Sequence, residues 1–265
     1  MDDAQFRKLI DYLGYSWAGY RKVRKGVKKR IRRHMQRLGC RDITAYLNRL
    51  ENQADSRNEC ELLMTVSISR FFRDQRLWQM LENQWLPDII ARNRLQIDVW
   101  SAGCACGEEV YSFRIIWERL KTRFESLPPL KILATDRHPQ NIGRARSGIY
   151  NRSSLREVAA DVRTGFFDSR KGSTQFVIKE ELKSDIRWEI RHLLTEPSVS
   201  GCSIIFLRNN ILTYYRQDTQ ITALSPIIKC LIPGGLFIIG CHETLPLKIE
   251  ELIPMAECPY VFKKK

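Results

Sequence analysis

The sequence predicts an α/β protein with a small helical N-terminal domain over residues 1–90 and a parallel-sheet domain over residues 91–265. Apolar residues before about residue 90 recur at spacings of three and four, which is typical of amphipathic helices. From residue 97 onward, short apolar runs that suit buried strands alternate with helical patterns, which favours a parallel sheet. Residues 150–185 are charged and poor in strand patterns, and Phe176–Ile178 suits part of a small hairpin.

The segment from Ile97 to Glu109 is the centre of the predicted sheet domain. It reads as a strand, a turn of small residues with Gly103 and Gly107, and the start of a helix at Glu108. Acidic residues at a helix N-terminus argue against a phosphate at that position, and the Gly-x-Gly-x-x-Gly pattern is absent. A cofactor with a cationic end fits better, and S-adenosylmethionine carries an ammonium and a sulfonium. A structural turn that binds no ligand is the alternative.

Polar residues also follow the other predicted strands. Asp136 ends the strand Lys131–Asp136, about 30 residues after the first glycine turn. In sheets of this kind a carboxylate at that point accepts hydrogen bonds from a ribose hydroxyl pair. The alternative is that Asp136 caps the helix that follows Pro139. The buried strand Ser203–Leu207 likewise ends in polar residues, Arg208-Asn209-Asn210.

The net charge of +14 is concentrated in one segment, because residues 21–37 hold ten cations and no acid. Its apolar positions, from Val23 to Leu38, recur in steps of four and three, so one face docks and the rest presents cations. Such a helix implies an acidic partner. The eight cysteines lack paired metal-ligand spacing, so we expect reduced thiols, no metal and a cytoplasmic protein. No run of about 18 apolar residues and no signal peptide pattern occurs.

Taken in order, these landmarks resemble the chemotaxis receptor methyltransferases of the CheR family, which modify receptor glutamates with S-adenosylmethionine. The resemblance covers about residues 5–260. It rests on Ser69–Asp74, Trp100–Glu109, Ala134–Asp136, Ala145–Tyr150, Ile205–Asn209 and Pro233–Gly235. It implies a helical N-terminal domain and a Rossmann-like class I methyltransferase domain with a small β-subdomain inserted within about 150–190.

The resemblance also implies roles for single residues. The cofactor-binding set would be Ser67, Ser69, Arg73, Gly103, Glu108, Asp136, His192, Leu193, Asn209 and Asn210. Within it, Glu108 would meet the amino group, Asp136 the ribose, and Arg73 would be the best single candidate for a catalytic role. The substrate-binding set on the basic helix would be Lys25, Lys28, Lys29, Arg32, Arg33 and Arg37. The expected substrate is an acidic helical protein, the cytoplasmic domain of a chemoreceptor, and the product S-adenosylhomocysteine.

Several positions depart from the family pattern, namely Ser67, His192, Asn210, Cys241 and His242. The substitutes are polar or small, so we expect cofactor binding to survive. Two alternatives remain open: a nucleic-acid methyltransferase or binder that uses the same cations, and a regulatory relative that binds cofactor with altered catalysis. Against nucleic acid, the basic helix has no interleaved aromatic residues and no nucleic-acid module is recognised.

Overall fold

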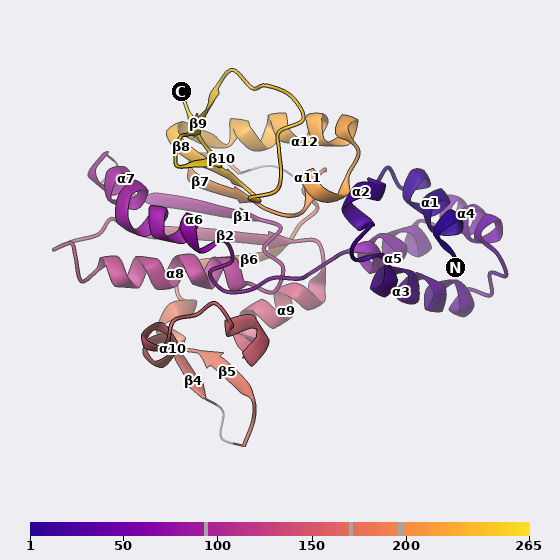
Figure 1. The fold of residues 1–265 in the computed structure, drawn as a ribbon, viewed down its shortest axis with the longest axis horizontal. Coiled ribbons are helices and arrows are strands. Elements are labelled where there is room, and N and C mark those ends of the chain that lie inside the picture. Colours follow the sequence, from indigo (N-terminus) through magenta and orange to yellow (C-terminus); the bar gives the residue numbers. More distant parts are fainter. Residues whose placement is uncertain (93–94, 170–171, 196–198) are drawn as a thin grey trace. The chain divides into compact units, whose positions relative to one another are not determined.

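The computed structural model describes residues 1–92, 95–169, 172–195 and 199–265 (Figure 1). Contacts divide the chain into two compact units. The helical unit comprises Met1–Val66, Asn209–Leu224 and Leu245–Leu247, and the sheet unit comprises Ser67–Arg208, Ser225–Thr244 and Lys248–Lys265. The contacts divide the chain earlier than the expected boundary near residue 90, because Leu77, Trp78 and Trp85 are buried in the core of the sheet unit.

The helical unit is built from amphipathic helices around one apolar core. These are α1 (Asp3–Tyr12), α2 (Trp17–Tyr20), α3 (Arg24–Arg37), α4 (Ile43–Asn52), α5 (Ala54–Met64), α11 (Ile211–Tyr214) and the first part of α12 (Gln217–Lys229). Phe6, Ile31 and Tyr46 are fully buried in the core. Asp42 caps α4, since its side chain accepts a hydrogen bond of 2.9 Å from the amide of Ala45.

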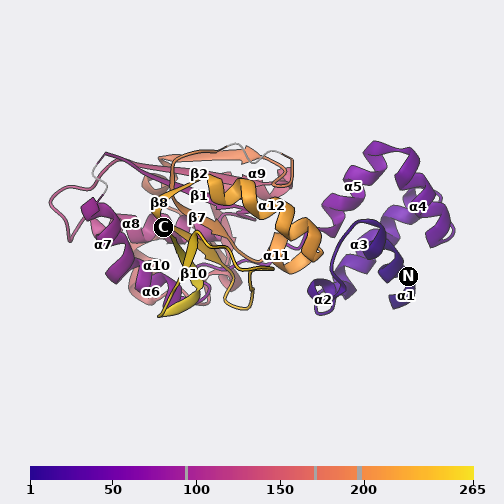
Figure 2. The same ribbon diagram turned by 90° about the horizontal axis from the view of Figure 1, so that it is seen from above.

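The sheet unit contains a seven-stranded sheet in the order β6-β2-β1-β7-β8-β10-β9, which confirms the predicted parallel sheet. The parallel strands are β1 (Ile97–Ala102), β2 (Leu130–Asp136), β6 (Ile186–Ile190), β7 (Cys202–Leu207) and β8 (Leu231–Ile239). Two antiparallel strands, β9 (Leu252–Met255) and β10 (Cys258–Lys264), complete it. Figures 1 and 2 both draw β1, β2 and β7 side by side. The chain order reverses direction at β1, the point where such sheets bind ligands.

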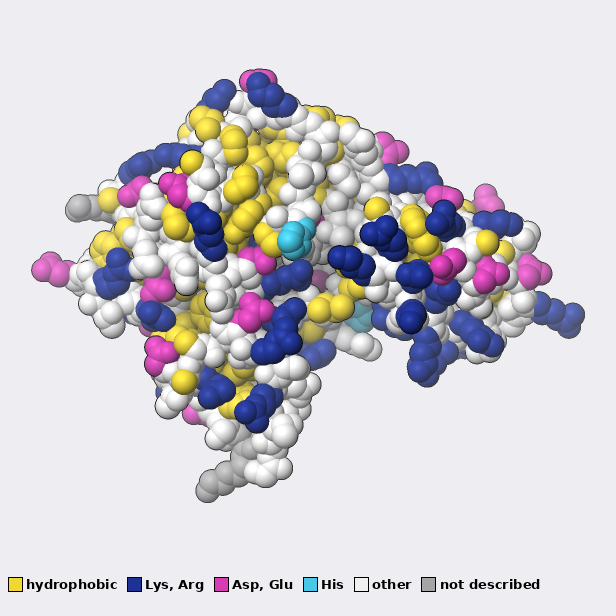
Figure 3. All heavy atoms as spheres, viewed as in Figure 1, with side chains coloured by type: hydrophobic (Ala, Val, Ile, Leu, Met, Phe, Trp, Pro, Cys, Tyr) yellow, Lys and Arg dark blue, Asp and Glu magenta, His cyan; other side chains and the backbone are white. Residues whose placement is uncertain are grey.

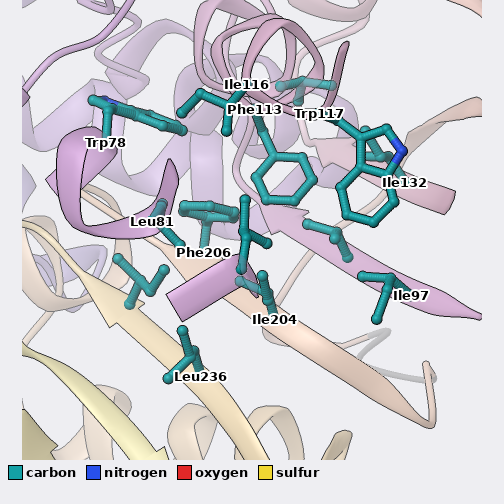
Figure 4. Packing of buried hydrophobic residues seen from close by; sticks show 14 of the residues in the cluster. Trp78, Leu81, Ile97, Phe113, Ile116, Trp117, Ile132, Ile204, Phe206 and Leu236 are labelled. Carbon is teal, nitrogen blue, oxygen red and sulfur yellow. The ribbon is translucent and has the colours of Figure 1, made fainter. Parts of the chain in front are cut away.

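One face of this sheet is covered by helices that share its core. They are α6 (Gln75–Met80), the π-helical turn η1 (Leu81–Trp85), α7 (Leu86–Arg92) and α8 (Glu108–Leu120). Figure 4 shows Phe206 of β7 between Trp78 of α6 and Phe113 of α8. The rings of Trp78 and Phe206 stack with centroids 5.8 Å apart. Burial of each such side chain contributes roughly 1.5–3 kcal/mol, so this packing fixes where α8 begins beside β1.

A smaller lobe follows α9 (Pro139–Ser147). Its antiparallel sheet has the order β3-β5-β4, formed by β3 (Ile149–Asn151), β5 (Gln175–Ile178) and β4 (Phe167–Ser169). Three short helices belong to the same stretch: η2 (Arg152–Leu155), α10 (Ala160–Phe166) and η3 (Glu180–Lys183). The chain returns to the main sheet at β6. A small β-structure therefore lies within the range where one was expected.

Candidate functional site

The candidate site lies at the carboxyl edge of the parallel strands, where several of the predicted residues meet. Because β1 and β2 are parallel neighbours, the loop after β1 and Asp136 at the end of β2 lie at one edge. The register pairs Asp136 with Ile190 of β6, so His192 and Leu193 follow at the same edge. Three strand ends thus contribute to one site, as the sequence predicted for β1 and β2.

The loop from Gly103 to Gly107 is held by its own backbone amides. The amides of Gly103 and Cys104 each donate a hydrogen bond of 2.8 Å to the carbonyl of Thr135. Gly103 and Gly107 both have φ of 89°, a left-handed conformation that glycine adopts without a Cβ penalty. A Cβ on Gly107 would also lie 2.9 Å from the Ala145 side chain. The turn therefore requires glycine where the sequence places it.

Asp136 is buried and has three hydrogen-bond donors around its carboxylate. The amide of Ala105 donates to Oδ2 at 3.0 Å, and the amide of His138 donates to Oδ1 at 2.8 Å. The Asn141 side chain donates to Oδ1 at 3.0 Å and to the Ser67 hydroxyl at 2.8 Å. Burial raises the pKa of Asp136, and these hydrogen bonds oppose that rise. Ser67 and Asp136, predicted separately, are thus joined through Asn141.

Glu108 is the first residue of α8 and is 3% exposed. Burial raises the pKa of its carboxyl, while the Ser154 and Ser69 hydroxyls lower it. The Ser154 hydroxyl donates to Oε1 at 3.3 Å. Oε2 is buried and has no hydrogen-bond partner in the part of the chain that the structure describes. A buried acceptor without a donor is costly, so this oxygen suits a cationic ligand group such as an ammonium.

The segment from Ser67 to Asp74 supplies the other predicted contacts. Ser67 and Ser69 are brought to Asp136 and Glu108 by the contacts above. Arg73 donates to the carbonyl of Ile68 at 3.3 Å, so its guanidinium folds back over this segment. No hydrogen bond or ion pair in the described ranges joins Arg73 to Asp136 or Glu108.

His192, Leu193, Asn209 and Asn210 have different surroundings. His192 and Leu193 are half-buried, and Nδ1 of His192 accepts a hydrogen bond of 3.3 Å from the amide of Leu194. Asn209 has a left-handed φ of 56°, and the Asn210 side chain accepts a hydrogen bond from the amide of Ile211 at the start of α11. By their contacts, both asparagines belong to the helical unit.

Two further residues of the site, Asn141 and Ser154, were missed by the sequence analysis. Asn141 lies in the first turn of α9, and Ser154 lies in η2. Their roles depend on contacts with segments that are distant in the sequence, and no sequence motif indicated either residue. Arg208 was noted only as a polar residue at the sheet edge. It forms ion pairs with Asp74 at 2.5 Å and Glu109 at 2.9 Å.

The predicted substrate-binding cations of the basic helix α3 fall into two groups, those with an acidic partner and those without one among the described residues. Lys28 is bonded to Asp3 at 2.8 Å, and Arg37 pairs with Glu59. The other predicted substrate contacts are exposed and form no ion pair with any residue that the structure describes: Lys25, Lys29, Arg32 and Arg33. Figure 3 shows Lys and Arg side chains gathered over the helical unit. We call Lys25, Lys29, Arg32 and Arg33 the basic stripe.

His34 of the same helix does not belong to the solvated face where its charged neighbours would place it. It is 2% exposed, and Nδ1 lies 2.7 Å from the Tyr46 hydroxyl while Nε2 lies 3.3 Å from a carboxylate oxygen of Glu59. The reason is its spacing, since it follows Ile31 by three residues and Val27 by seven, on the apolar stripe. Burial lowers the pKa of His34, and Glu59 opposes that change.

Residues 1–92, 95–169, 172–195 and 199–265 contain no group of three or more potential metal ligands. None of the helices in these ranges has the length and apolar character needed to cross a membrane.

A parallel sheet with a glycine turn after β1, an acid at the end of β2 and, at the start of α8, a buried carboxylate with one oxygen that no described residue partners is the arrangement of a Rossmann-like class I methyltransferase. Its cofactor is S-adenosylmethionine. Residues 67–262 match the family model described as the CheR methyltransferase, SAM binding domain, so the chain belongs to the CheR methyltransferase family.

Curated relatives are similar over most of this chain. The chain is 32% identical over 235 residues to a chemotaxis protein methyltransferase of Listeria monocytogenes, covering 88% of this chain and 86% of that protein. It is 33% identical over 201 residues to the Listeria innocua protein of the same name, covering 76% and 74%. A 104.1 kDa uncharacterized protein of Rhodobacter capsulatus is 28% identical over 221 residues, and the match spans 83% of this chain but only 23% of that protein.

Proposed function

We propose that this protein is a protein-glutamate O-methyltransferase that methylates the cytoplasmic domain of a chemoreceptor. The observation that supports this most directly is a cofactor-type site in the sheet unit together with an exposed basic stripe on α3. The printed names of the Listeria relatives agree with a role in chemotaxis. The corresponding location is the cytoplasm, where receptor signalling domains lie.

In this proposal the cofactor-binding residues hold the amino-acid end and the ribose of S-adenosylmethionine. Oε2 of Glu108 accepts from the ammonium, and Ser69 lies beside it. Asp136, with Asn141 and Ser67, faces the ribose hydroxyls. His192 and Leu193 line the adenine side, and Arg73 neutralises negative charge near the reacting groups. We assign Asn209 and Asn210 to the cofactor from the family resemblance. The lack of a partner for Oε2 of Glu108 among the described residues supports a cationic ligand at this position.

The chemistry needs no general base. The bound cofactor supplies an electrophilic methyl: an O–C bond forms to the acceptor carboxylate as the C–S bond breaks, leaving an ester and a neutral thioether. A glutamate with an ordinary pKa of about 4.3 is already ionised at neutral pH, so no proton has to move. The protein's own residues orient the reactants and exclude water, which can contribute many orders of magnitude in rate.

The acceptor is an acidic helix that meets the basic stripe. Lys25, Lys29 and Arg32 follow one another by four and three residues, so they project from the same side of α3. Opposite charge accelerates encounter and orients the partner, and the effect weakens as salt rises. Lys28 and Arg37 have partners within the helical unit, and we assign them the smaller part of this attraction.

The deciding experiment follows labelled methyl groups from S-adenosylmethionine into receptor cytoplasmic fragments. The proposal expects label on the receptor that is released as methanol by mild base, as esters require. Label in added nucleic acid would instead support a nucleic-acid methyltransferase. Saturable binding of S-adenosylhomocysteine by calorimetry without any transfer would support a regulatory relative.

Charge reversal tests the assignment of the acceptor surface. The double variant Lys25→Glu, Arg32→Glu should lower kcat/KM for the receptor on the order of tenfold or more, because two attractive contacts become repulsive. Its affinity for S-adenosylhomocysteine should not change. The matched control is Lys8→Glu, which reverses an exposed cation on α1 of the same unit and should leave both quantities unchanged. Equal losses in the double variant and the control would reject the basic stripe as the docking surface.

A further inference from the structure

We propose that Arg208 is a positioning residue for the cofactor, whose guanidinium holds the segment Ser67–Asp74 against the start of α8. Arg208 has no part in the proposed function as stated above, and its side chain is only 5% exposed at the end of β7. The inference rests on the proposed function in one respect, namely that Ser67, Ser69 and Arg73 contact the cofactor.

The segment needs an external support because it has little structure of its own. Residues 65–70 form neither helix nor strand, and the following turn leads into α6. Phe72 and Asp74 have left-handed φ values of 52° and 64°, which non-glycine residues adopt only when their surroundings impose them. The positions of Ser67, Ser69 and Arg73 are therefore set by contacts from outside the segment.

One guanidinium makes three hydrogen bonds to two parts of the unit, the segment and α8. Nη2 of Arg208 donates to Oδ2 of Asp74 at 2.5 Å and to the carbonyl of Arg73 at 3.2 Å. Nη1 donates to Oε2 of Glu109 in the first turn of α8 at 2.9 Å. The other carboxylate oxygen of Glu109 accepts from the Ser101 hydroxyl in β1 at 2.7 Å. Arg208 thereby connects the segment to α8 and, through Glu109, to β1.

Other hydrogen bonds hold the same end of the segment, at Phe72 and Arg73. The amide of Phe72 donates to the Ser112 hydroxyl at 2.9 Å, and that hydroxyl donates to the carbonyl of Glu108 at 2.7 Å. The indole of Trp78 donates to the carbonyl of Arg73 at 2.7 Å. The segment is thus joined through Ser112 to Glu108, the residue that we assign to the cofactor's ammonium.

The electrostatics make Arg208 hard to replace. Burial alone would lower the pKa of Arg208, but the nearby carboxylates of Glu109 and Asp74 outweigh burial and raise it. Burial would likewise raise the pKa of Asp74, and Arg208 reverses the direction. Without the guanidinium, two largely buried carboxylates would lose their shared cation, and the Asp74 carboxylate would keep only its hydrogen bond from the Cys241 thiol among the described residues. A planar fork suits this arrangement better than the single nitrogen of lysine, because two separate nitrogens of Arg208 reach the two acids.

The test compares loss of cofactor binding with loss of stability. Arg208→Lys should raise the Kd for S-adenosylhomocysteine by about tenfold, and Arg208→Met by about a hundredfold, with KM for the receptor unchanged. Asp74→Asn should resemble Arg208→Lys. Hydrogen exchange at the Phe71 and Phe72 amides should accelerate in all three. If Arg208→Met does not fold, Arg208→Lys and Asp74→Asn supply the comparison.

The matched control is Gly235→Ala, which destabilises the same unit away from the segment. Its new Cβ would lie 2.9 Å from the carbonyl of Ser203, near the opposite end of β7. The proposal expects little change in Kd for this control, even where its melting temperature falls as far as that of Arg208→Lys. If Gly235→Ala and Arg208→Lys had equal melting temperatures and equal increases in Kd, the role of Arg208 would be purely structural.

The same measurements keep this inference separate from the proposed function. Absence of receptor methylation by the native protein would reject the proposed acceptor while leaving the Kd comparison intact. Unchanged cofactor affinity in Ser69→Ala and Arg73→Ala would reject the segment as a cofactor contact, and the inference with it.

Discussion

The amide of Ala105, in the glycine turn after β1, donates a hydrogen bond of 3.0 Å to Oδ2 of Asp136 at the end of β2. Ala105 itself has a left-handed φ of 48°, which costs about 1–2 kcal/mol for a residue with a Cβ. The carboxylate of Asp136 therefore does two things at once in our proposal. It stabilises the turn in an unfavourable conformation, and it presents an anionic edge for the ribose.

Asp136→Asn should impair both roles. An amide side chain has one acceptor oxygen, so its NH2 group would face either the amide of Ala105 or the amide of His138, donor against donor. We expect a loss of about 1–3 kcal/mol in the free energy of unfolding. We also expect at least a tenfold weaker affinity for S-adenosylhomocysteine. Thermal unfolding and calorimetry measure the two effects, and a variant as stable as the native protein would contradict this account of the turn.

Glu108→Gln should behave in the opposite way in the absence of cofactor. Burial raises the pKa of both Glu108 and Asp136, but Oε2 of Glu108 lacks a protein donor. A carboxyl whose pKa is raised by folding disfavours the native state above its unfolded pKa. Removing that charge should therefore raise the melting temperature at pH 7, by about 2–4 °C for each kcal/mol.

The same substitution should weaken cofactor binding by about 10- to 100-fold, since hydrogen bonds to charged groups contribute about 1.5–3 kcal/mol. The paired result, a more stable protein that binds S-adenosylhomocysteine less well, distinguishes a ligand-binding carboxylate from a structural one. If Glu108 were purely structural, Glu108→Gln would lower the stability of the protein and leave its calorimetric affinity for S-adenosylhomocysteine unchanged.

The strands of the site could be predicted from the sequence because their signals are local. The apolar run from Ile97 and the carboxylate of Asp136 are readable from adjacent residues, and parallel pairing then brings their carboxyl ends together. The bond from Asn141 to Ser67 could not be predicted in this way, because it depends on the placement of two segments that are 74 residues apart.

The boundaries between the two units could not be predicted from the sequence for a related reason. The helical pattern of Leu77–Ile90 looks the same whichever core it packs against, and tertiary packing assigns it to the sheet unit. Residues 209–224 follow β7 directly, and yet their contacts place them with α1–α5. The burial of His34 follows from local spacing, since it shares the apolar stripe with Val27 and Ile31 although its neighbours in the sequence are charged.

The environment of His34 predicts a pH dependence for the helical unit. Burial lowers the pKa of His34 in the native state, so the unfolded chain binds its proton more readily. Stability should therefore fall as the pH drops through the unfolded value of about 6.5. The slope of melting temperature between pH 7.5 and 5.5 should be smaller in His34→Gln than in the native protein. Arg37 lowers the pKa of Glu59, whose effect begins only below about pH 4.5, outside this range. Identical slopes would contradict the prediction.

Two glycines of the helical unit should respond oppositely to alanine. A Cβ on Gly19 of α2 would lie 2.0 Å from the carbonyl oxygen of Thr213 in α11, and a backbone carbonyl cannot turn aside as a side chain can. Gly19→Ala should therefore cost about 1–3 kcal/mol or more through overpacking. A Cβ on Gly26 of α3 would meet nothing closer than the Arg30 side chain at 4.0 Å, so Gly26→Ala should stabilise the helix by about 1 kcal/mol. Because both variants add one methyl group, thermal unfolding of the pair isolates the close approach of α2 and α11. Similar shifts in both would show that Gly19 can move away from Thr213 at little cost.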